Sequence, residues 1–342
     1  MTSMHKRVLI TGAGGSIGCH VVRHFLKNTE WHIVATDSFR HKGLTDRIWR
    51  VTHKYPETLP RLQVFTHDLK APISNMLVDK IGLIDYIVNL ASYTDVYDSI
   101  KAPMQTCHSN VSGMLTMLEY ARIARPEVFL HISTDEVYGP TDGNTFHPEW
   151  APIVPSSPYA ASKAAQEAIA ISYWCSYGLP LVVVNIMNNF GEMQSPFKFP
   201  LIVMNALNDG FPVKIHGTPD DIGSRFYIHS RNSADALLFI LRHEVPFLHV
   251  DGAMDRPDRY NVVGERCVTN LEFAQLIAEY WGKSLQYILE PGNVSRPGHD
   301  RHYGLDGSKL ASLGWNPPVS LEDSLRETVA WYKRHPEWLR PL

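Results

Sequence analysis

A tyrosine and a lysine suited to acid–base chemistry stand in the sequence YAASK at 159–163. Tyr159 and Lys163 are four residues apart, so in a helix both side chains lie on one face. An ammonium group beside a phenol lowers the phenol pKa, which lets the tyrosine accept a proton from a hydroxyl group while a hydride leaves the same carbon. Thr134 ends an apolar segment upstream of this pair. The pattern predicts alcohol oxidation, with an ordinary exposed helix face as the alternative.

Two adjacent carboxylates, Asp135 and Glu136, directly follow Thr134. Carboxylates in two different environments can divide the work of an elimination. One protonates a departing hydroxyl group, and the other removes a proton from a carbon that a neighbouring carbonyl has made acidic. The competing interpretation is a pair of solvated acids after a strand.

A glycine-rich turn, TGAGGSIG at 11–18, lies between an expected strand and an expected helix. Its three glycines are Gly12, Gly15 and Gly18. Glycines here allow the backbone to approach a pyrophosphate, whose charge is met by the positive helix end. Asp37 follows the next strand about 20 residues later, where a carboxylate binds the ribose hydroxyls of NAD and repels the extra phosphate of NADP. The motif predicts NAD, while Arg40 and Lys42 leave NADP as a minor alternative.

The elements that must position these residues form a regular alternation. Consecutively apolar segments, read as strands, occupy 7–11, 32–36, 62–66, 85–90, 127–133 and 181–186, and helices are expected at 103–124, 157–177, 230–243 and 269–281. Strands of this kind separated by helices predict an α/β fold with a doubly wound parallel (Rossmann) sheet. We expect the polar segment 38–61 to be a surface excursion. Side chains after strands or in the glycine turn are further NAD candidates: Ser16, Ile17, Asp68, Leu69, Leu90, Ala91 and Ser92.

We interpret the chain as two lobes. Residues 1–190 form the NAD-binding domain, which also receives 225–250, and 191–342 form mainly a smaller α+β substrate-binding lobe. With 342 residues, 32 Lys and Arg against 35 Asp and Glu, and a net charge of −3, no basic field favours nucleic acid or an anionic membrane. No apolar stretch approaches the ~20 residues of a membrane helix. The four cysteines form no CxxC motif, and we expect a cytoplasmic protein.

These motifs, in this order, resemble the extended short-chain dehydrogenase/reductases that act on nucleotide sugars. The segments STDEVYG at 133–139, SPYAASKA at 157–164, RPGHDRHY at 296–303 and LGWNP at 313–317 are similar to the nucleoside-diphosphate-glucose 4,6-dehydratases over nearly the whole chain. The resemblance implies an NAD-dependent hydro-lyase with tightly bound NAD. Its substrate would be an NDP-hexose of the dTDP- or UDP-glucose type.

The resemblance also implies roles for individual residues. Asp135 would be the acid, Glu136 the base, and Asn110, in SNVSG, a cofactor contact. The resemblance places Asn189, Lys198, Arg225, Asn261, Arg296 and His299 near the sugar diphosphate, and we add Thr94 and His216 as substrate-binding candidates. Three segments, 93–98, 213–217 and 223–232, depart from the family's usual residues. They leave the nucleobase and the hexose open.

Two further expectations concern metals and assembly. His20 and His24 are four residues apart, but the sequence shows no third ligand, so we interpret them as solvated helix residues and expect no metal. Helices 103–124 and 157–177 resemble those through which relatives pair, so we expect a homodimer, although their apolar faces could be buried within one subunit. The enzymatic alternative is a 4-epimerase or decarboxylase of the same superfamily. The non-enzymatic alternative is an NAD-binding protein without catalytic activity.

Overall fold

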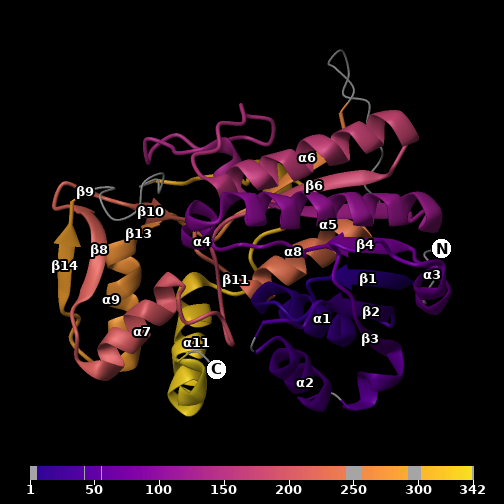
Figure 1. Cartoon of the computed structure of the whole chain (residues 1–342). Helices are drawn as coiled ribbons and strands as arrows, with labels where there is room; N and C mark the ends of the chain where they lie inside the picture. Colours follow the sequence, from indigo (N-terminus) through magenta and orange to yellow (C-terminus); the bar gives the residue numbers. More distant parts are fainter. Residues whose placement is uncertain (1–5, 42, 55, 244–255, 292–301, 341–342) are drawn as a thin grey trace.

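A seven-stranded parallel sheet lies at the centre of the computed structural model, which describes residues 6–41, 43–54, 56–243, 256–291 and 302–340 (Figure 1). The strand order is β12-β6-β5-β4-β1-β2-β3. The strands are β1 Arg7–Thr11, β2 His32–Asp37, β3 Leu62–Thr66, β4 Tyr86–Asn89, β5 Val128–Thr134, β6 Leu181–Ile186 and β12 Asp258–Val262. The predicted doubly wound α/β fold is confirmed, and all six strands expected from the sequence belong to this sheet.

Both faces of the sheet are buried, as the apolar strands require. In β1, Val8 and Ile10 join one hydrophobic core and Leu9 joins the other, because successive side chains of a strand point to opposite faces. α1 and α8 pack against each other on one side of the sheet, and α5 and α6 pack against each other on the other side (Figure 1). The helices of this lobe are α1 Ser16–Asn28, α2 Leu44–Lys54, α3 Asn75–Ile81, α4 Val96–Lys101, α5 Pro103–Ala124, α6 Pro158–Tyr177 and α8 Ser230–Arg242.

The segment between β2 and β3 is more ordered than its sequence indicates. The expectation of a surface excursion at 38–61 is wrong over α2 and the 3₁₀ helix η1 Pro56–Arg61. Leu44, Ile48 and Val51 are buried at helical spacing. Arg47 is buried on the same helix because its guanidinium donates to backbone carbonyls. A buried arginine within a short apolar stripe obscures the pattern that would reveal such a helix.

The second lobe is built from short strands and three main helices. Its elements are β7 Asn189–Phe190, α7 Phe199–Asp209, β8 Val213–Thr218, β9 Asp221–Ile222, β10 Ser224–Arg225, β11 Ile228–His229, β13 Val268–Thr269, α9 Asn270–Trp281, β14 Tyr287–Glu290, α10 Ser308–Ser312, α11 Leu321–Arg334 and η3 Pro336–Trp338. The chain crosses between lobes more than once, because α8 and β12 return to the parallel sheet. Within the described ranges, no helix is long and apolar enough to cross a membrane.

Candidate active site

A cleft of about 280 Å³ opens where the strands of the parallel sheet end, the edge at which such sheets bind ligands. It brings together the glycine turn, the ends of β2 and β4, and the Tyr159–Lys163 pair of α6. Of the predicted NAD residues, those that line it are Gly12, Gly15, Ser16, Ile17, Gly18, Asp37, Asp68, Leu69, Leu90, Ala91, Ser92, Asn110, Tyr159 and Lys163. One cleft therefore contains the residues that sequence reasoning drew from six separate segments.

The glycine turn has the close packing that a bound pyrophosphate requires. Gly12 has φ +65°, and a Cβ there would lie 2.9 Å from the backbone nitrogen of Ala91. A Cβ at Gly18 would lie 2.1 Å from the carbonyl oxygen of Gly12. Two hydroxyl oxygens in the same cleft, those of Ser92 and Ser133, are buried without a hydrogen-bond partner among the described residues. This cradle fits a dinucleotide, whose phosphates and ribose would supply those partners.

The acid that ends β2 also stabilises the turn. Asp37 accepts a hydrogen bond from the backbone N–H of Gly14 through Oδ2, at 3.0 Å. Arg40 forms an ion pair with Asp68 at 3.0 Å, so its charge is already balanced inside the cleft. Lys42, the other cation that suggested NADP, lies outside the described residues. The carboxylate of Asp37 and the pairing of Arg40 both favour a ribose without a 2′-phosphate.

Asn110 of α5 lines the cleft, but the hydrogen bonds of its side chain are made to other residues of the protein. Its Oδ1 accepts from the backbone N–H of Tyr93 at 2.7 Å, and its Nδ2 donates to the Tyr93 carbonyl oxygen and to Ser162 Oγ. The side chain is almost completely buried. Asn110 therefore fixes the loop after β4 onto α5 and α6, and its direct contact with a cofactor stays a prediction.

The paired carboxylates lie in a 3₁₀ turn, η2 Asp135–Tyr138, directly after β5. Thr134 caps this turn and donates from Oγ1 to Asp135 Oδ1 at 2.9 Å, while Asp135 Oδ2 is buried with no hydrogen-bond partner in the described chain. Burial raises the pKa of Asp135 to about 6, despite the Thr134 hydrogen bond and the positive charge of Arg225. Asp135 thus retains its proton at a higher pH than an exposed aspartate does, as a general acid requires.

Tyr159 and Lys163 share one face of α6 as predicted, but the expected effect of the lysine on the tyrosine is not seen. Burial, followed by the charges of Glu136 and Asp135, raises the pKa of Tyr159. The Lys163 ammonium instead donates to the Ile132 carbonyl oxygen at 2.8 Å and to Gln166. Burial lowers the pKa of Lys163 to about 7, although the charge of Glu167 opposes this shift.

A buried polar network, which the sequence patterns did not reveal, connects β12 and β6 to α6 and to the turn that carries Asp135 and Glu136. Arg259 of β12 pairs with Glu167 of α6 at 2.7 Å, and both side chains are fully buried. Arg259 also donates to Tyr138 Oη of η2 at 2.9 Å. Asn185 of β6 donates both to Glu167 Oε1 and to the Thr134 carbonyl oxygen. Because Arg259 and Glu167 are 92 residues apart, no local sequence pattern indicates that they form a pair. The pairing of β12 with β6 brings them together.

The predicted substrate residues lie in several places. Lys198 donates from Nζ to the Thr94 carbonyl oxygen at 3.3 Å, next to the cofactor cleft. Asn189 begins β7, and its Oδ1 accepts from Ser233 Oγ at 2.7 Å. Arg225 is buried over the ring of Tyr303, and the electrostatic effect of its charge on Asp135 places it near the acids.

Of the other predicted substrate residues, two do not line the cleft and two lie outside the described ranges. His216 lies in β8, 3.9 Å from Glu290 of β14. Asn261 is fully buried, and its Nδ2 donates to the carbonyl oxygens of His147 and Asp306, while its Oδ1 has no partner among the described residues. Arg296 and His299 lie among the residues that the structure does not describe.

The interpretation of His20 and His24 as solvated helix residues is wrong for His20. Its side chain is 3% exposed and contacts Glu192, which also contacts His229. The three side chains place their donor atoms within 4.8 Å of one another. His24 contacts Asp235 instead, at 3.3 Å. Sequence reasoning did not identify Glu192 as a partner of His20, because Glu192 lies 172 positions away, after the chain has crossed between lobes.

Comparison with known proteins identifies the family. The family model described as GDP-mannose 4,6 dehydratase matches residues 9–328. The dTDP-glucose 4,6-dehydratase of Salmonella typhimurium is 31% identical over 358 residues, covering 97% of this chain and 94% of that protein. A trifunctional UDP-glucose 4,6-dehydratase, epimerase and reductase of Arabidopsis thaliana is 31% identical, covering 97% of this chain and 48% of that protein.

Solved structures agree with this assignment. The dTDP-glucose 4,6-dehydratase DesIV of Streptomyces venezuelae, determined with NAD and TYD bound, superposes with a TM-score of 0.82 at 30% identity, covering 98% of this chain and all of that one. A UDP-glucose 4-epimerase of Thermus thermophilus in complex with NAD has a TM-score of 0.78 at 27% identity, covering 96% and 99%. The chain belongs to the GDP-mannose 4,6-dehydratase family within the extended short-chain dehydrogenase/reductases.

Proposed function

We propose that this protein is an NAD-dependent 4,6-dehydratase that converts an NDP-hexose of the dTDP- or UDP-glucose type to the 4-keto-6-deoxy sugar and water. The observation that carries this proposal is the placement of Asp135 and Glu136 beside Tyr159, next to the NAD cleft. An enzyme that only oxidises and reduces C4 needs one acid–base residue there. A buried acid with a raised pKa next to a second carboxylate supports an elimination as well.

The chain's own residues account for each proton. When bound, NAD would supply the hydride acceptor for C4 and the hydride donor for C6, so the net reaction would be redox-neutral. Tyr159 removes the proton of the C4 hydroxyl as the hydride leaves. Glu136 then removes the C5 proton, which the new C4 carbonyl has acidified, and Asp135 donates its proton to the departing C6 hydroxyl. Glu136 returns its proton to C5 once the hydride has reached C6. The proton that Tyr159 took from the C4 hydroxyl is released to solvent as Asp135 takes one up, so all three residues regain their starting states.

Lys163 supports this chemistry by its charge. In the structure its ammonium lies between the Ile132 carbonyl oxygen and Gln166, and the nearby carboxylate of Glu167 favours the protonated form. A ribose hydroxyl bound at the same ammonium would bring the positive charge toward Tyr159. That charge would offset the effect of Glu136 and Asp135, which oppose ionisation of the phenol.

We also propose a homodimer and a cytoplasmic location. Several apolar side chains of α5 remain exposed in the single chain, including Met104 at 85% and Ile123 at 61%. A second copy packed against α5 and α6 would cover them. The four cysteines are free, which is typical of a reducing compartment.

The decisive experiment incubates the purified, NAD-loaded protein with dTDP-, UDP-, GDP- and CDP-hexoses and follows the products by mass spectrometry. Loss of one water from a single nucleotide sugar is the expected result. An isomeric product would instead indicate the 4-epimerase reaction named for the Thermus structure, and loss of carbon dioxide from a uronic acid would indicate decarboxylation. No conversion across the panel would favour an NAD-binding protein without catalytic activity.

A further inference from the structure

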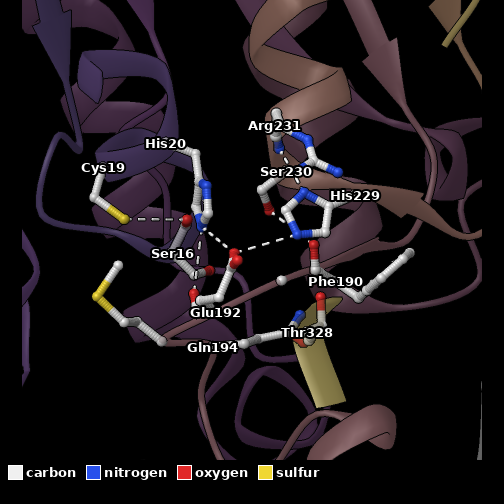
Figure 2. Close-up of polar contacts among 12 residues, drawn as sticks. Ser16, Cys19, His20, Phe190, Glu192, Gln194, His229, Ser230, Arg231 and Thr328 are labelled. Carbon is white, nitrogen blue, oxygen red and sulfur yellow. Dashed lines mark hydrogen bonds and ion pairs between the residues drawn. The ribbon is translucent and has the colours of Figure 1, made fainter. Parts of the chain in front are cut away.

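Glu192 lies on the segment that leaves the parallel sheet for the second lobe, and two histidines from different elements contact it (Figure 2). His229, at the start of α8, places Nε2 3.2 Å from Glu192 Oε2. His20, in α1, places Nε2 3.5 Å from the same oxygen and 3.3 Å from the Glu192 carbonyl oxygen. The histidines are almost completely buried, and Glu192 is 15% exposed. The three line a cleft of about 850 Å³ that shares no residue with the NAD cleft.

The spacing of these atoms also resembles a metal site. Ligand atoms at about 2.0–2.1 Å from a tetrahedral zinc ion are about 3.3 Å apart, close to the two distances seen here. The ring protons decide between the two interpretations. His229 Nδ1 accepts the backbone N–H of Arg231 at 2.9 Å, which places the ring proton on Nε2 (Figure 2). A protonated nitrogen has no lone pair for a metal, and metal-bound histidines normally donate from their other nitrogen.

His20 leads to the same conclusion. Its Nε2 faces the carbonyl oxygen of Glu192, which can only accept, so this nitrogen also carries a proton. Burial lowers the pKa of His20 to about 4, which keeps its ring neutral at pH 7. Although burial alone would raise the pKa of Glu192, the hydrogen bond from His229 and both imidazoles lower it well below its usual range. The cluster is therefore an ionised carboxylate that lies 3.2 Å from the Nε2 of His229 and 3.5 Å from that of His20, while His20 donates to the Glu192 carbonyl oxygen.

The segment that Glu192 holds, residues 189–194, is contacted from several other elements. Arg47 of α2 donates to the Met193 carbonyl oxygen at 2.7 Å and to the Gly14 carbonyl oxygen at 3.2 Å, which joins this segment directly to the glycine turn. Tyr332 of α11 accepts from the backbone N–H of Gln194 at 2.8 Å and donates to the Gly191 carbonyl oxygen.

The backbone of the segment shows that these contacts hold it in place. Met193 has φ +61°, a conformation that a residue with a side chain adopts only when its surroundings enforce it. The segment begins with Asn189, whose carbonyl oxygen accepts from Gln194 Nε2 at 2.7 Å. Movement of the segment would thus move Asn189 relative to the helix that follows the glycine turn.

We propose that Glu192 is a positioning residue, which holds segment 189–194 against α1 so that Asn189 and the glycine turn keep a fixed relative placement. The inference rests on the proposed function, because it assumes that Asn189 contacts the sugar substrate and the glycine turn binds NAD. Hydride transfer needs the two ligands in contact at a defined geometry, and a displacement of about 1 Å can cost about 100-fold in rate. Glu192 acts on the reaction through this geometry without touching either ligand.

The test measures reduction of bound NAD in a single turnover by its absorbance, with saturating NDP-hexose and with rates expressed per NAD-loaded molecule. Glu192→Ala should reduce this rate constant about tenfold or more. A purely structural role would lower the yield of NAD-loaded enzyme and leave the rate per loaded molecule unchanged. His20→Gln, which retains an N–H donor, should stay within about threefold of wild type, whereas His20→Phe should resemble Glu192→Ala.

His24→Leu is the matched control. His24 lies one turn beyond His20 and contacts Asp235 of α8, so it also joins α1 to α8, but it is not bonded to segment 189–194. This variant should reduce NAD at the wild-type rate. Hydrogen exchange of 189–194 should become about tenfold faster in Glu192→Ala and stay unchanged in the control.

The outcomes separate this inference from the proposed function. If none of the NDP-hexoses causes the wild type to reduce its bound NAD, the dehydratase assignment fails. Hydrogen exchange then decides by itself whether Glu192 holds the segment. A wild-type rate constant in Glu192→Ala, or unchanged exchange, would overturn the proposal. Stoichiometric zinc in the purified enzyme that disappears in His20→Phe would also overturn it, because a metal would then hold the three side chains.

Discussion

Arg259→Met tests the buried network beneath the catalytic turn. Arg259 and Glu167 are both fully buried, and their guanidinium–carboxylate contact is 2.7 Å long. Removal of the arginine leaves the Glu167 carboxylate, among the described residues, with the amide of Asn185 as its hydrogen-bond donor and the charge of Lys163 nearby. A buried charge that loses its ion-pair partner costs about 3–5 kcal/mol. We expect the Tm of the NAD-loaded protein to fall by roughly 6–20 °C, measured by calorimetry.

The double variant Arg259→Met/Glu167→Met provides the control, because it removes the second charge as well. It should recover most of the lost stability, since an apolar pair of similar volume is often equivalent to a buried ion pair.

Two results would refute this reasoning. An Arg259→Met enzyme that loses less than about 1 kcal/mol would show that water or a rearranged side chain compensates Glu167. A double variant less stable than the single one would show that the ion pair itself, rather than the penalty of an unpaired charge, stabilises the fold.

Three further predictions concern catalysis and the cofactor. Glu136→Gln should still reduce bound NAD on mixing with substrate but stall before loss of water, and dehydration at the wild-type rate would reject Glu136 as the base. The elimination rate should fall as pH rises through about 6, where Asp135 loses the proton it donates, and Asp135→Asn should be slow with no such dependence; the rate of product formation against pH checks both. Gly18→Ala should purify with less bound NAD, because its Cβ would lie 2.1 Å from the Gly12 carbonyl oxygen; the absorbance ratio of the purified protein measures this loss.

Local patterns predicted the elements whose residues are neighbours in the chain. The strands of the parallel sheet, the glycine turn and the Tyr159–Lys163 face of α6 all follow from residue types within a few positions. Helix α2 was not predicted, because the buried Arg47 interrupts its apolar stripe. Strand β12 was not predicted, because it lies within the part of the sequence that was interpreted as the second lobe.

The sequence by itself determined the α/β fold, the place of the dinucleotide turn and the residue types available for oxidation and elimination. Their meaning depends on periodicity and spacing, which are local properties of the chain. Only the tertiary structure decided how those residues are tuned: burial raises the pKa of Asp135, and Glu167 lies near Lys163 with Arg259 as its partner. It also decided the surroundings of Glu192. Such effects depend on which distant segments meet and how much water they exclude, and no short stretch of sequence contains that information.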